Sequence, residues 1–522
     1  MKIFFNRPGV RRIAALVFAF FGVVVADRTA KATDDASTEM TSLIRQQGFA
    51  TGDVGYILLD LETGKVVDRA QGDQPFVPGS VLKLATSLVA WQILGPDFHF
   101  TTRLWRKDAA LYLQGSGDPV LAATDLRELA GSLLELRAAH NWQAFYVDAT
   151  AIMPALEISA RQPLAADYNP GFGALNVDFN RLVLAWPVPK NNDVKTGKPI
   201  SPFRITSEAD GLTVPIDWMA PTPASNPLPS GVSFVLASPG SNQQPESWSY
   251  NPDLMRTALA TPGALTLPVK QADPMTARIF RAIALGQNVN LPLPQPGAVP
   301  GDAILVGQHN SPSLAEMLPR LLRYSNNLTA EMIGLTSSIR LSGKATTLAD
   351  SGQQQMHWLS SHLPATNWQG FRIVNQSGLD GDNRATPRQI AEILRRMATD
   401  PALAACLPAL KLKDGMVHQA DIGASVLTGQ PQISGKSGTM DYAAGLAGLI
   451  TTPGGRHLAY AIFITDDRQR AALAAAFDPR VLQPAKEGHA WTLRARHLEA
   501  DLLQHWLAQL AAHVPHNVPG ND

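Results

Sequence analysis

A buried helix that begins at a serine and carries a lysine one turn later constrains this chain more than any other stretch. Pro78 and Gly79 form a break, and from Ser80 onward apolar residues recur at helical spacing, at Leu84, Leu88 and Trp91. Ser80 and Lys83 are three residues apart and are therefore neighbours on one helical face. An amine in that position can take the proton of a hydroxyl, and the helix terminus and the apolar surroundings both favour its neutral form. Because an isolated S-x-x-K is usually a helix cap and a surface lysine, the interpretation needs support from elsewhere in the chain.

Two further motifs supply that support. Ser325 and Asn327 form an S-x-N between two helical stretches, and Lys436-Ser437-Gly438-Thr439 forms a K-S-G-T just before a C-terminal hairpin. S-x-x-K, S-x-N and K-[ST]-G in this order resemble the active-site set of penicillin-binding proteins and serine β-lactamases. Tyr324 leaves open an alternative Y-x-N register, in which its hydroxyl would carry the proton instead of Ser325.

Two other matches are interpreted as decoys. Lys195-Thr196-Gly197 fits the third motif more literally, but it lies in a polar loop and precedes every S-x-N. Ser249-Tyr250-Asn251 fits the second motif, but Pro252 follows it and no helices flank it. A lysine that lines a cleft from an edge strand is better placed at Lys436.

The chemistry of acyl transfer assigns a role to each motif. Ser80 attacks a carbonyl and becomes the acyl-enzyme, while Lys83 takes its proton. Ser325 relays a proton toward the leaving amine, and Asn327 contacts both Lys83 and the substrate amide. The cation of Lys436 and the hydroxyls of Ser437 and Thr439 suit a substrate that ends in a carboxylate, and the N–H groups of Ser80 and Thr439 would form the oxyanion hole.

Composition indicates an exported globular protein. The 522 residues carry 44 basic and 44 acidic side chains, so no basic excess points to nucleic acid. Residues 1–32 have the basic, apolar and small-residue regions of a secretory signal peptide, which predicts a periplasmic location; an uncleaved membrane anchor is the alternative. The single cysteine, Cys406, excludes an internal disulfide and lies in an apolar setting typical of a buried thiol. Peripheral association with the membrane or the cell wall is compatible with this pattern, whereas the terminal helix at 493–512 fits packing onto a sheet.

The periodicity predicts a mixed α/β (α+β) protein built around an antiparallel sheet flanked by helices. Strands are expected at 54–60, 444–451 and 457–465, and the expected catalytic domain covers 33–102 and 264–522. The stretch 103–263 contains strand-like pieces and, after Tyr168, is rich in proline, asparagine and serine; it is expected to form a β-rich insertion of one or two domains.

Taken with the long interval between the first two motifs, the chain resembles the class C low-molecular-mass penicillin-binding proteins. The segments that carry this resemblance are 113–119, 325–332 and Ser377-Gly378-Leu379. It implies a transpeptidase-like domain with a five-stranded antiparallel sheet, a large insertion after the Ser-Lys helix, and a D-alanyl-D-alanine carboxypeptidase or endopeptidase. Such an enzyme acts on peptidoglycan peptides ending in D-Ala-D-Ala, is acylated by β-lactam antibiotics and needs no metal or other cofactor. The resemblance also implies that Met440, the residue after the third motif, is a candidate for lining the pocket that binds a substrate side chain. Serine at 437, where threonine is usual, keeps the hydroxyl.

Two rival functions remain open. The first is a serine β-lactamase, which in class A needs a glutamate-held water; no glutamate lies between Glu331 and Glu392, where that residue would fall. The second is a non-catalytic protein of the same fold that binds peptidoglycan or senses β-lactams. The absence of H-E-x-x-H and G-x-S-x-G argues against a metallopeptidase or a Ser-His-Asp hydrolase.

Overall fold

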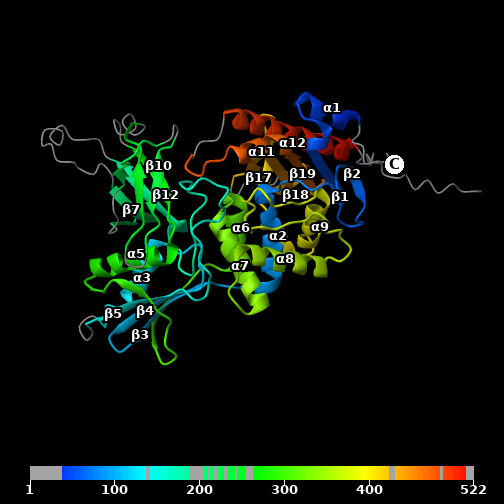
Figure 1. Ribbon diagram of the computed structural model, residues 1–522. Helices are drawn as coiled ribbons and strands as arrows, with labels where there is room; N and C mark the ends of the chain where they lie inside the picture. The colour runs from blue at the N-terminus through cyan, green and yellow to red at the C-terminus, as the bar shows by residue number, and fades with distance from the viewer. Residues whose placement is uncertain are drawn as a thin grey trace, which may run out of the picture.

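The computed structural model describes residues 38–512 apart from 137–140, 187–203, 210–211, 216–220, 229–231, 242–243, 254–262, 422–429 and 482–485. The expected signal peptide and Lys195-Thr196-Gly197 lie outside these residues. Two bodies lie side by side (Figure 1): one combines helices and a large sheet from both ends of the chain, and the other is built from its middle. In the described part, no helix is both long enough and apolar enough to cross a membrane.

A seven-stranded antiparallel sheet forms the centre of the larger body. Its order, β16–β15–β17–β18–β19–β1–β2, places the first strands of the chain beside the last ones. The bounds are β1 Val54–Asp60, β2 Val66–Ala70, β15 Ala409–Lys413, β16 Met416–Gln419, β17 Gln432–Met440, β18 Ala443–Thr451 and β19 His457–Thr465. Strand β1 is buried at every position, since helices cover both faces of the sheet.

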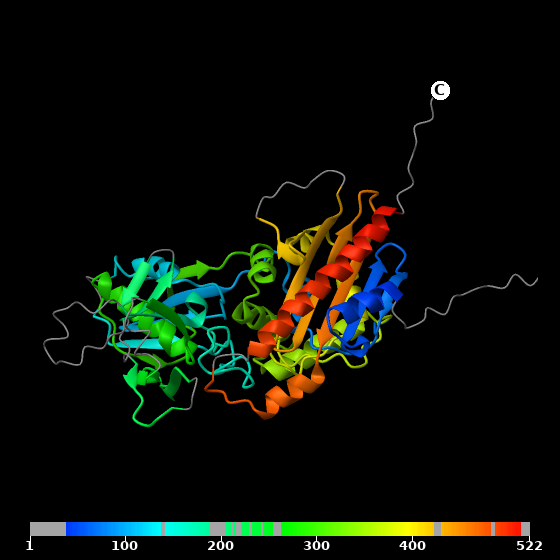
Figure 2. The ribbon, with the colours of Figure 1, turned by 90° about the horizontal axis from the view of Figure 1, so that it is seen from above.

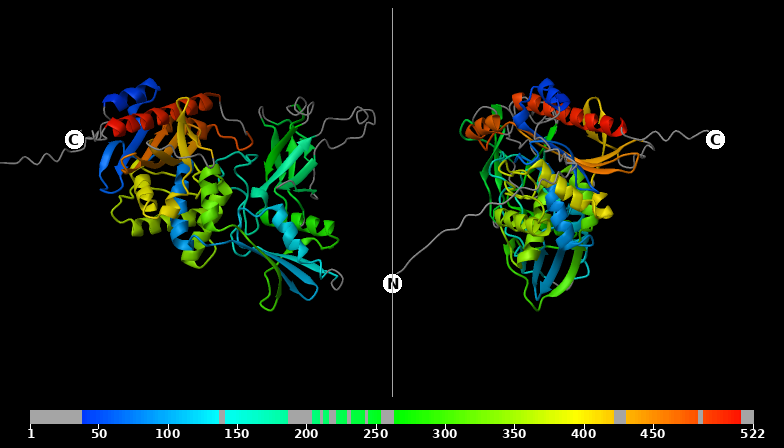
Figure 3. Two further views of the ribbon diagram at one scale, coloured as in Figure 1. Left: turned by 180° about the vertical axis from the view of Figure 1, so that it is seen from behind. Right: turned by 90° about the vertical axis from the view of Figure 1, so that its right-hand side faces the viewer.

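The helices form a layer on each side of this sheet (Figures 2 and 3). Helices α1 (Thr38–Gln46) and α12 (Lys486–Ala512) cover one face, and Figure 2 shows α12 running across the strands. The other face carries α2 (Lys83–Leu94) in the middle, with four helices packed around it (Figure 3): α6 Leu314–Tyr324, α7 Asn327–Ser342, α8 Leu348–His362 and α9 Pro387–Met397. Short helices α10 (Pro401–Ala404) and α11 (Asp467–Ala475) complete this body. Because α2 is enclosed, its residues from Lys83 to Trp91 are buried, as the apolar pattern predicted.

The second body contains three small sheets. The first, β13–β5–β4–β3–β14, carries α3 (Ala123–Gly131) and α5 (Ala272–Gly286) on its apolar face; the other two are β12–β6–β7–β8 and β10–β11–β9. The strand bounds are β3 Thr101–Lys107, β4 Ala110–Gly115, β5 Ala144–Asp148, β6 Arg181–Trp186, β7 Arg204–Ala209, β8 Leu212–Pro215, β9 Thr222–Pro223, β10 Phe234–Ser238, β11 Ser247–Tyr250, β12 Gly263–Pro268, β13 Pro294–Pro296 and β14 Ile304–Asn310.

The predicted architecture is confirmed, with three corrections. The expected end of the insertion at residue 263 is wrong, because β14 pairs with β3, β13 pairs with β5, and α5 packs on α3. The larger sheet has seven strands because the hairpin β15–β16 extends the edge beyond β17. Ser80 does not cap the helix, since Gly79–Leu82 form a 3₁₀ turn that leads into α2.

Candidate active site

The Ser80 turn and the start of α2 place a hydroxyl against an amine. Lys83 is fully buried, and its Nζ donates to Ser80 Oγ at 2.9 Å, to Asn327 Oδ1 at 2.9 Å and to the Ser377 carbonyl at 2.8 Å. Ser80 itself is half-buried and therefore still reachable from solvent. The three acceptors hold the amine in one position beside the hydroxyl.

The electrostatics of this pocket favour the neutral form of Lys83. Burial lowers its pKa well below the usual value, and the nearby cation of Lys436 lowers it further, while Glu331 opposes the shift. In the neutral form Nζ has two N–H groups, which suffice for Asn327 and Ser377, so the Ser80 hydroxyl becomes the donor in its contact and its proton faces the lone pair of Nζ. The structure thus places the two residues predicted as nucleophile and base within hydrogen-bonding distance, in surroundings that favour the neutral amine.

The second motif lies where α6 ends and α7 begins. Ser325 ends α6 in a left-handed conformation with φ of 58°, and the Asn326 side chain caps α7 by accepting the Thr329 N–H. This tight connection directs Asn327, the first residue of α7, at Lys83. Ser325 is half-buried beside it, whereas Tyr324 is 67% exposed, which disfavours the alternative Y-x-N register.

The third motif lies on β17 and is pressed against the Ser80 turn. A Cβ on Gly438 would lie 2.6 Å from the Pro78 carbonyl oxygen and 2.8 Å from the Ser80 nitrogen. Only glycine allows this approach, which brings the backbone of Gly438 and Thr439 beside the N–H of Ser80. The two donors expected for an oxyanion hole therefore belong to segments in direct contact.

The side chains of β17 divide between the two faces of the sheet. Lys436 is buried toward α2, where burial lowers its pKa to about 7, and its Nζ donates to the Ser437 carbonyl at 2.6 Å. Ser437 and Thr439 are exposed on the opposite face. Met440, half-buried at the end of β17, has its methyl group 3.9 Å from the position of a Cβ on Gly381.

Glu331 is a buried carboxylate that lies outside the three motifs. It accepts the N–H groups of Gln376 and Ser377 at 2.8 and 2.9 Å, and burial raises its pKa to about 7. By fixing this loop, it fixes the Ser377 carbonyl that receives Lys83. The resemblance rested partly on Ser377-Gly378-Leu379. In the structure this segment contacts Lys83 through the backbone carbonyl of Ser377, and a backbone contact cannot be predicted from residue types.

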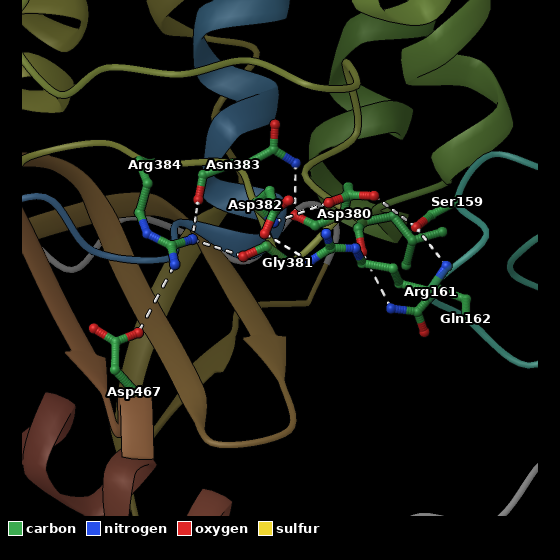
Figure 4. A network of polar contacts seen from close by, with 10 residues as sticks. Ser159, Arg161, Gln162, Asp380, Gly381, Asp382, Asn383, Arg384 and Asp467 are labelled. Carbon is green, nitrogen blue, oxygen red and sulfur yellow. Dashed lines mark hydrogen bonds and ion pairs between the residues drawn. The ribbon is translucent and has the colours of Figure 1, made fainter. Parts of the chain in front are cut away.

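The insertion also contributes to the site. The Asn327 amide donates to the carbonyl of Tyr168 at 3.0 Å, so Asn327 is held from both sides. Figure 4 shows that a nearby segment of the insertion, which includes Ser159 and Arg161, contacts the loop after Ser377. Ser159 Oγ donates to Asp380 at 2.9 Å, and Arg161 forms an ion pair with Asp382 at 2.7 Å. No sequence pattern indicated this contact.

Among the described residues, no group of three or more His, Cys, Asp or Glu side chains could hold a metal ion. Ser249-Tyr250-Asn251, the other match to the second motif, lies at the end of strand β11 in the insertion, with Asn251 just beyond the strand.

The contact of Ser80 with the buried Lys83, the S-x-N and the K-S-G strand place the protein among the serine enzymes that recognise penicillin. A model of the D-Ala-D-Ala carboxypeptidase 3 (S13) family matches residues 36–155 and 261–481. The chain belongs to this family, which confirms the resemblance to class C low-molecular-mass penicillin-binding proteins.

Individual relatives agree with this assignment. The D-alanyl-D-alanine carboxypeptidase of Actinomadura sp. (strain R39) is 23% identical over 495 residues, covering 88% of this chain and 87% of the relative. The crystal structure of penicillin binding protein 4 from Haemophilus influenzae has a TM-score of 0.64 at 17% identity, covering 90% of this chain and 100% of the other. The same protein complexed with a novel β-lactam has a TM-score of 0.63 at 17% identity, with the same coverage. At this identity the solved structures establish the fold.

Proposed function

We propose that Ser80 is the acylated nucleophile of a serine-type D-Ala-D-Ala carboxypeptidase acting on peptidoglycan stem peptides. The observation that carries the assignment is the contact of Lys83 Nζ with Ser80 Oγ, in a pocket that favours the neutral amine. A hydroxyl held beside a neutral amine needs no histidine to become a nucleophile.

The acylation half-reaction follows from this arrangement. The Ser80 proton passes to Lys83 as Oγ bonds to the carbonyl carbon of the penultimate D-alanine, and the oxyanion is stabilised by the N–H groups of Ser80 and Thr439. Ser325, held by the charge of Lys436, relays this proton from Lys83 to the leaving nitrogen, which returns Lys83 to its neutral form. Free D-alanine departs, and the ester remains on Ser80.

Deacylation completes the cycle. Water attacks the ester, Lys83 accepts its proton, and the same proton returns to Ser80 as the shortened peptide leaves. Asn327 orients both Lys83 and the substrate amide. The same chemistry on a D-alanyl crosslink would give endopeptidase activity, and on a β-lactam it would give a penicilloyl ester.

That penicilloyl ester is expected to persist, which separates this proposal from a β-lactamase. Glu331, whose charge acts on the pKa of Lys83, is fully buried and accepts two backbone N–H groups. It is therefore not available to hold a hydrolytic water above the ester, as a class A glutamate does. We also propose that residues 1–32 export the enzyme and that it acts at the cell wall.

Met440 is the proposed wall of a pocket for a side chain of the stem peptide. Its neighbour Arg470 is directed at the same loop, because a Cβ on Gly381 would lie 2.4 Å from the Arg470 guanidinium. Arg470 is anchored by donating to the Asp441 carbonyl at 2.6 Å. An apolar wall beside a cation suits a side chain that is aliphatic with a polar end.

The test combines labelling with turnover. Mass spectrometry after benzylpenicillin treatment should find the added mass on the peptide that contains Ser80, and diacetyl-lysyl-D-Ala-D-Ala should release D-alanine. Ser80→Ala should abolish both activities. Ser87→Ala is the matched control, because it removes from the same helix a buried hydroxyl that has no hydrogen-bond partner among the described residues. Release of D-alanine by Ser80→Ala, or rapid penicillin turnover without a labelled enzyme, would contradict the proposal.

A further inference from the structure

Arg496 is a cation that α12 places over the exposed end of β17. Its Nη2 donates to Thr439 Oγ1 at 3.3 Å. Thr439 and Ser437 share one face of the strand because side chains two apart point the same way. Their partners on β18, Ala444 and Leu446, belong to the core that α12 covers, so this is the face of α12 and not the face of Lys436.

The charge of Arg496 is not neutralised locally. Its side chain is exposed, and in the described chain no carboxylate lies within 4.0 Å of its guanidinium. Glu499, one turn further along α12, is the nearest acidic neighbour on the helix, but burial raises its pKa to about 8, which keeps it uncharged at neutral pH. Arg496 therefore presents a positive charge beside two hydroxyls, and among the described residues its hydrogen bond to Thr439 uses one of its five N–H donors.

We propose that Arg496 binds the C-terminal carboxylate of the substrate, together with the hydroxyls of Ser437 and Thr439. The inference rests on the proposed function, because it needs Ser80 to attack the adjacent peptide bond. The Gly438–Thr439 backbone touches the Ser80 turn, and the carboxylate of a one-residue leaving group lies about 4 Å along the chain from the scissile carbonyl. The guanidinium fork matches a carboxylate in two parallel hydrogen bonds, which a lysine cannot reproduce.

A structural alternative is that Arg496 only ties α12 to the sheet. The two roles differ in what they discriminate. An anchor affects all substrates equally, whereas a carboxylate ligand affects only substrates with a free C-terminal carboxylate. The measurement is therefore a ratio: kcat/KM for diacetyl-lysyl-D-Ala-D-Ala against its C-terminal amide, and the acylation rate by benzylpenicillin against its methyl ester, both at low ionic strength.

Arg496→Gln should lower the acid-to-amide and acid-to-ester ratios about tenfold or more, the effect of losing a hydrogen bond to a charged group. Arg496→Lys should restore part of the ratio, since it keeps the charge without the fork. Arg494→Gln is the matched control: it removes the same charge from the same helix, where Arg494 lies over the Phe49 ring at 5.9 Å. It should leave both ratios unchanged.

An equal loss on both members of each pair, or no change in either ratio, overturns the inference, and a fall in melting temperature with equal losses identifies the anchor. These outcomes are distinct from failure of the proposed function. In that case the wild-type enzyme would release no D-alanine and form no penicilloyl ester on Ser80.

Discussion

Replacing Gly438 by alanine tests whether the contact between β17 and the Ser80 turn builds the oxyanion hole. The new Cβ would meet backbone atoms, at 2.6 Å from the Pro78 oxygen and 2.8 Å from the Ser80 nitrogen. To restore an ordinary contact of 3.4 Å, the two segments must separate by about 0.8 Å. A displacement near 1 Å costs about 100-fold in rate, and a lost oxyanion-hole donor costs about 100- to 1,000-fold. Overpacking a close contact costs about 1–3 kcal/mol in stability.

The assay for Gly438→Ala is the second-order rate of Ser80 acylation by benzylpenicillin, with the melting temperature measured in parallel. We expect a rate at least about 100-fold below wild type in a protein that still unfolds cooperatively. Gly52→Ala is the control, since a Cβ at that position has no atom within 4 Å, and it should change neither quantity. If Gly438→Ala acylates at the wild-type rate, the oxyanion hole is not formed by these two segments.

Three further predictions concern the groups around the nucleophile. Acylation by benzylpenicillin should fall above about pH 7 as Lys436 loses its proton, because burial lowers its pKa to about 7. The methyl ester should fall less, because it loses only the effect of the charge on Ser325 and not the attraction for a carboxylate. Identical profiles would contradict a role of the charge in attracting the carboxylate. Glu331→Gln replaces a carboxylate that accepts two N–H groups by an amide with one acceptor oxygen. The free energy of unfolding should fall by about 1–3 kcal/mol, and acylation of Ser80 should slow. An unchanged melting temperature would refute the role of Glu331 in fixing the loop. Ser159→Ala removes a buried hydrogen bond to Asp380 and should lower the free energy of unfolding by about 1 kcal/mol. Arg161→Ala should lower it less, because its exposed ion pair with Asp382 contributes about 0.2–1 kcal/mol. Denaturant titrations of both variants measure the two losses, and a larger loss for Arg161→Ala would contradict the prediction.

Short apolar runs predicted the central strands of the larger body well. Strands β1 and β19 have the predicted bounds, because each is an uninterrupted run of mostly apolar and aromatic residues, typical of a strand covered on both faces. The three motifs also predicted Lys83, Asn327 and Lys436 as one site, since each motif follows a recognisable break in the chain.

The parts that escaped prediction depend on long-range contacts. Strand β14 is largely exposed or half-buried, and β13 is the segment Pro294–Pro296, so neither has the alternation that marks a strand. Both become strands only because β3 and β5 offer free edges. The local sequence pattern alone therefore could not predict the residue at which the insertion ends.

Asn327 shows why the catalytic site is not a property of the larger body alone. Its side-chain oxygen accepts from Lys83, and its amide donates to Tyr168 in the insertion, so the orientation of one side chain depends on both bodies. The Tyr168 contact is made by a backbone carbonyl, so any residue at 168 that keeps the local backbone would preserve it. The requirement is instead on the position of the segment, which Ser159 and Arg161 secure against the loop after Ser377. Because that loop also supplies the carbonyl that receives Lys83, a shift of the insertion would disturb two of the three hydrogen-bond partners of the base. The insertion thus bears on the proposed chemistry through the geometry of Lys83.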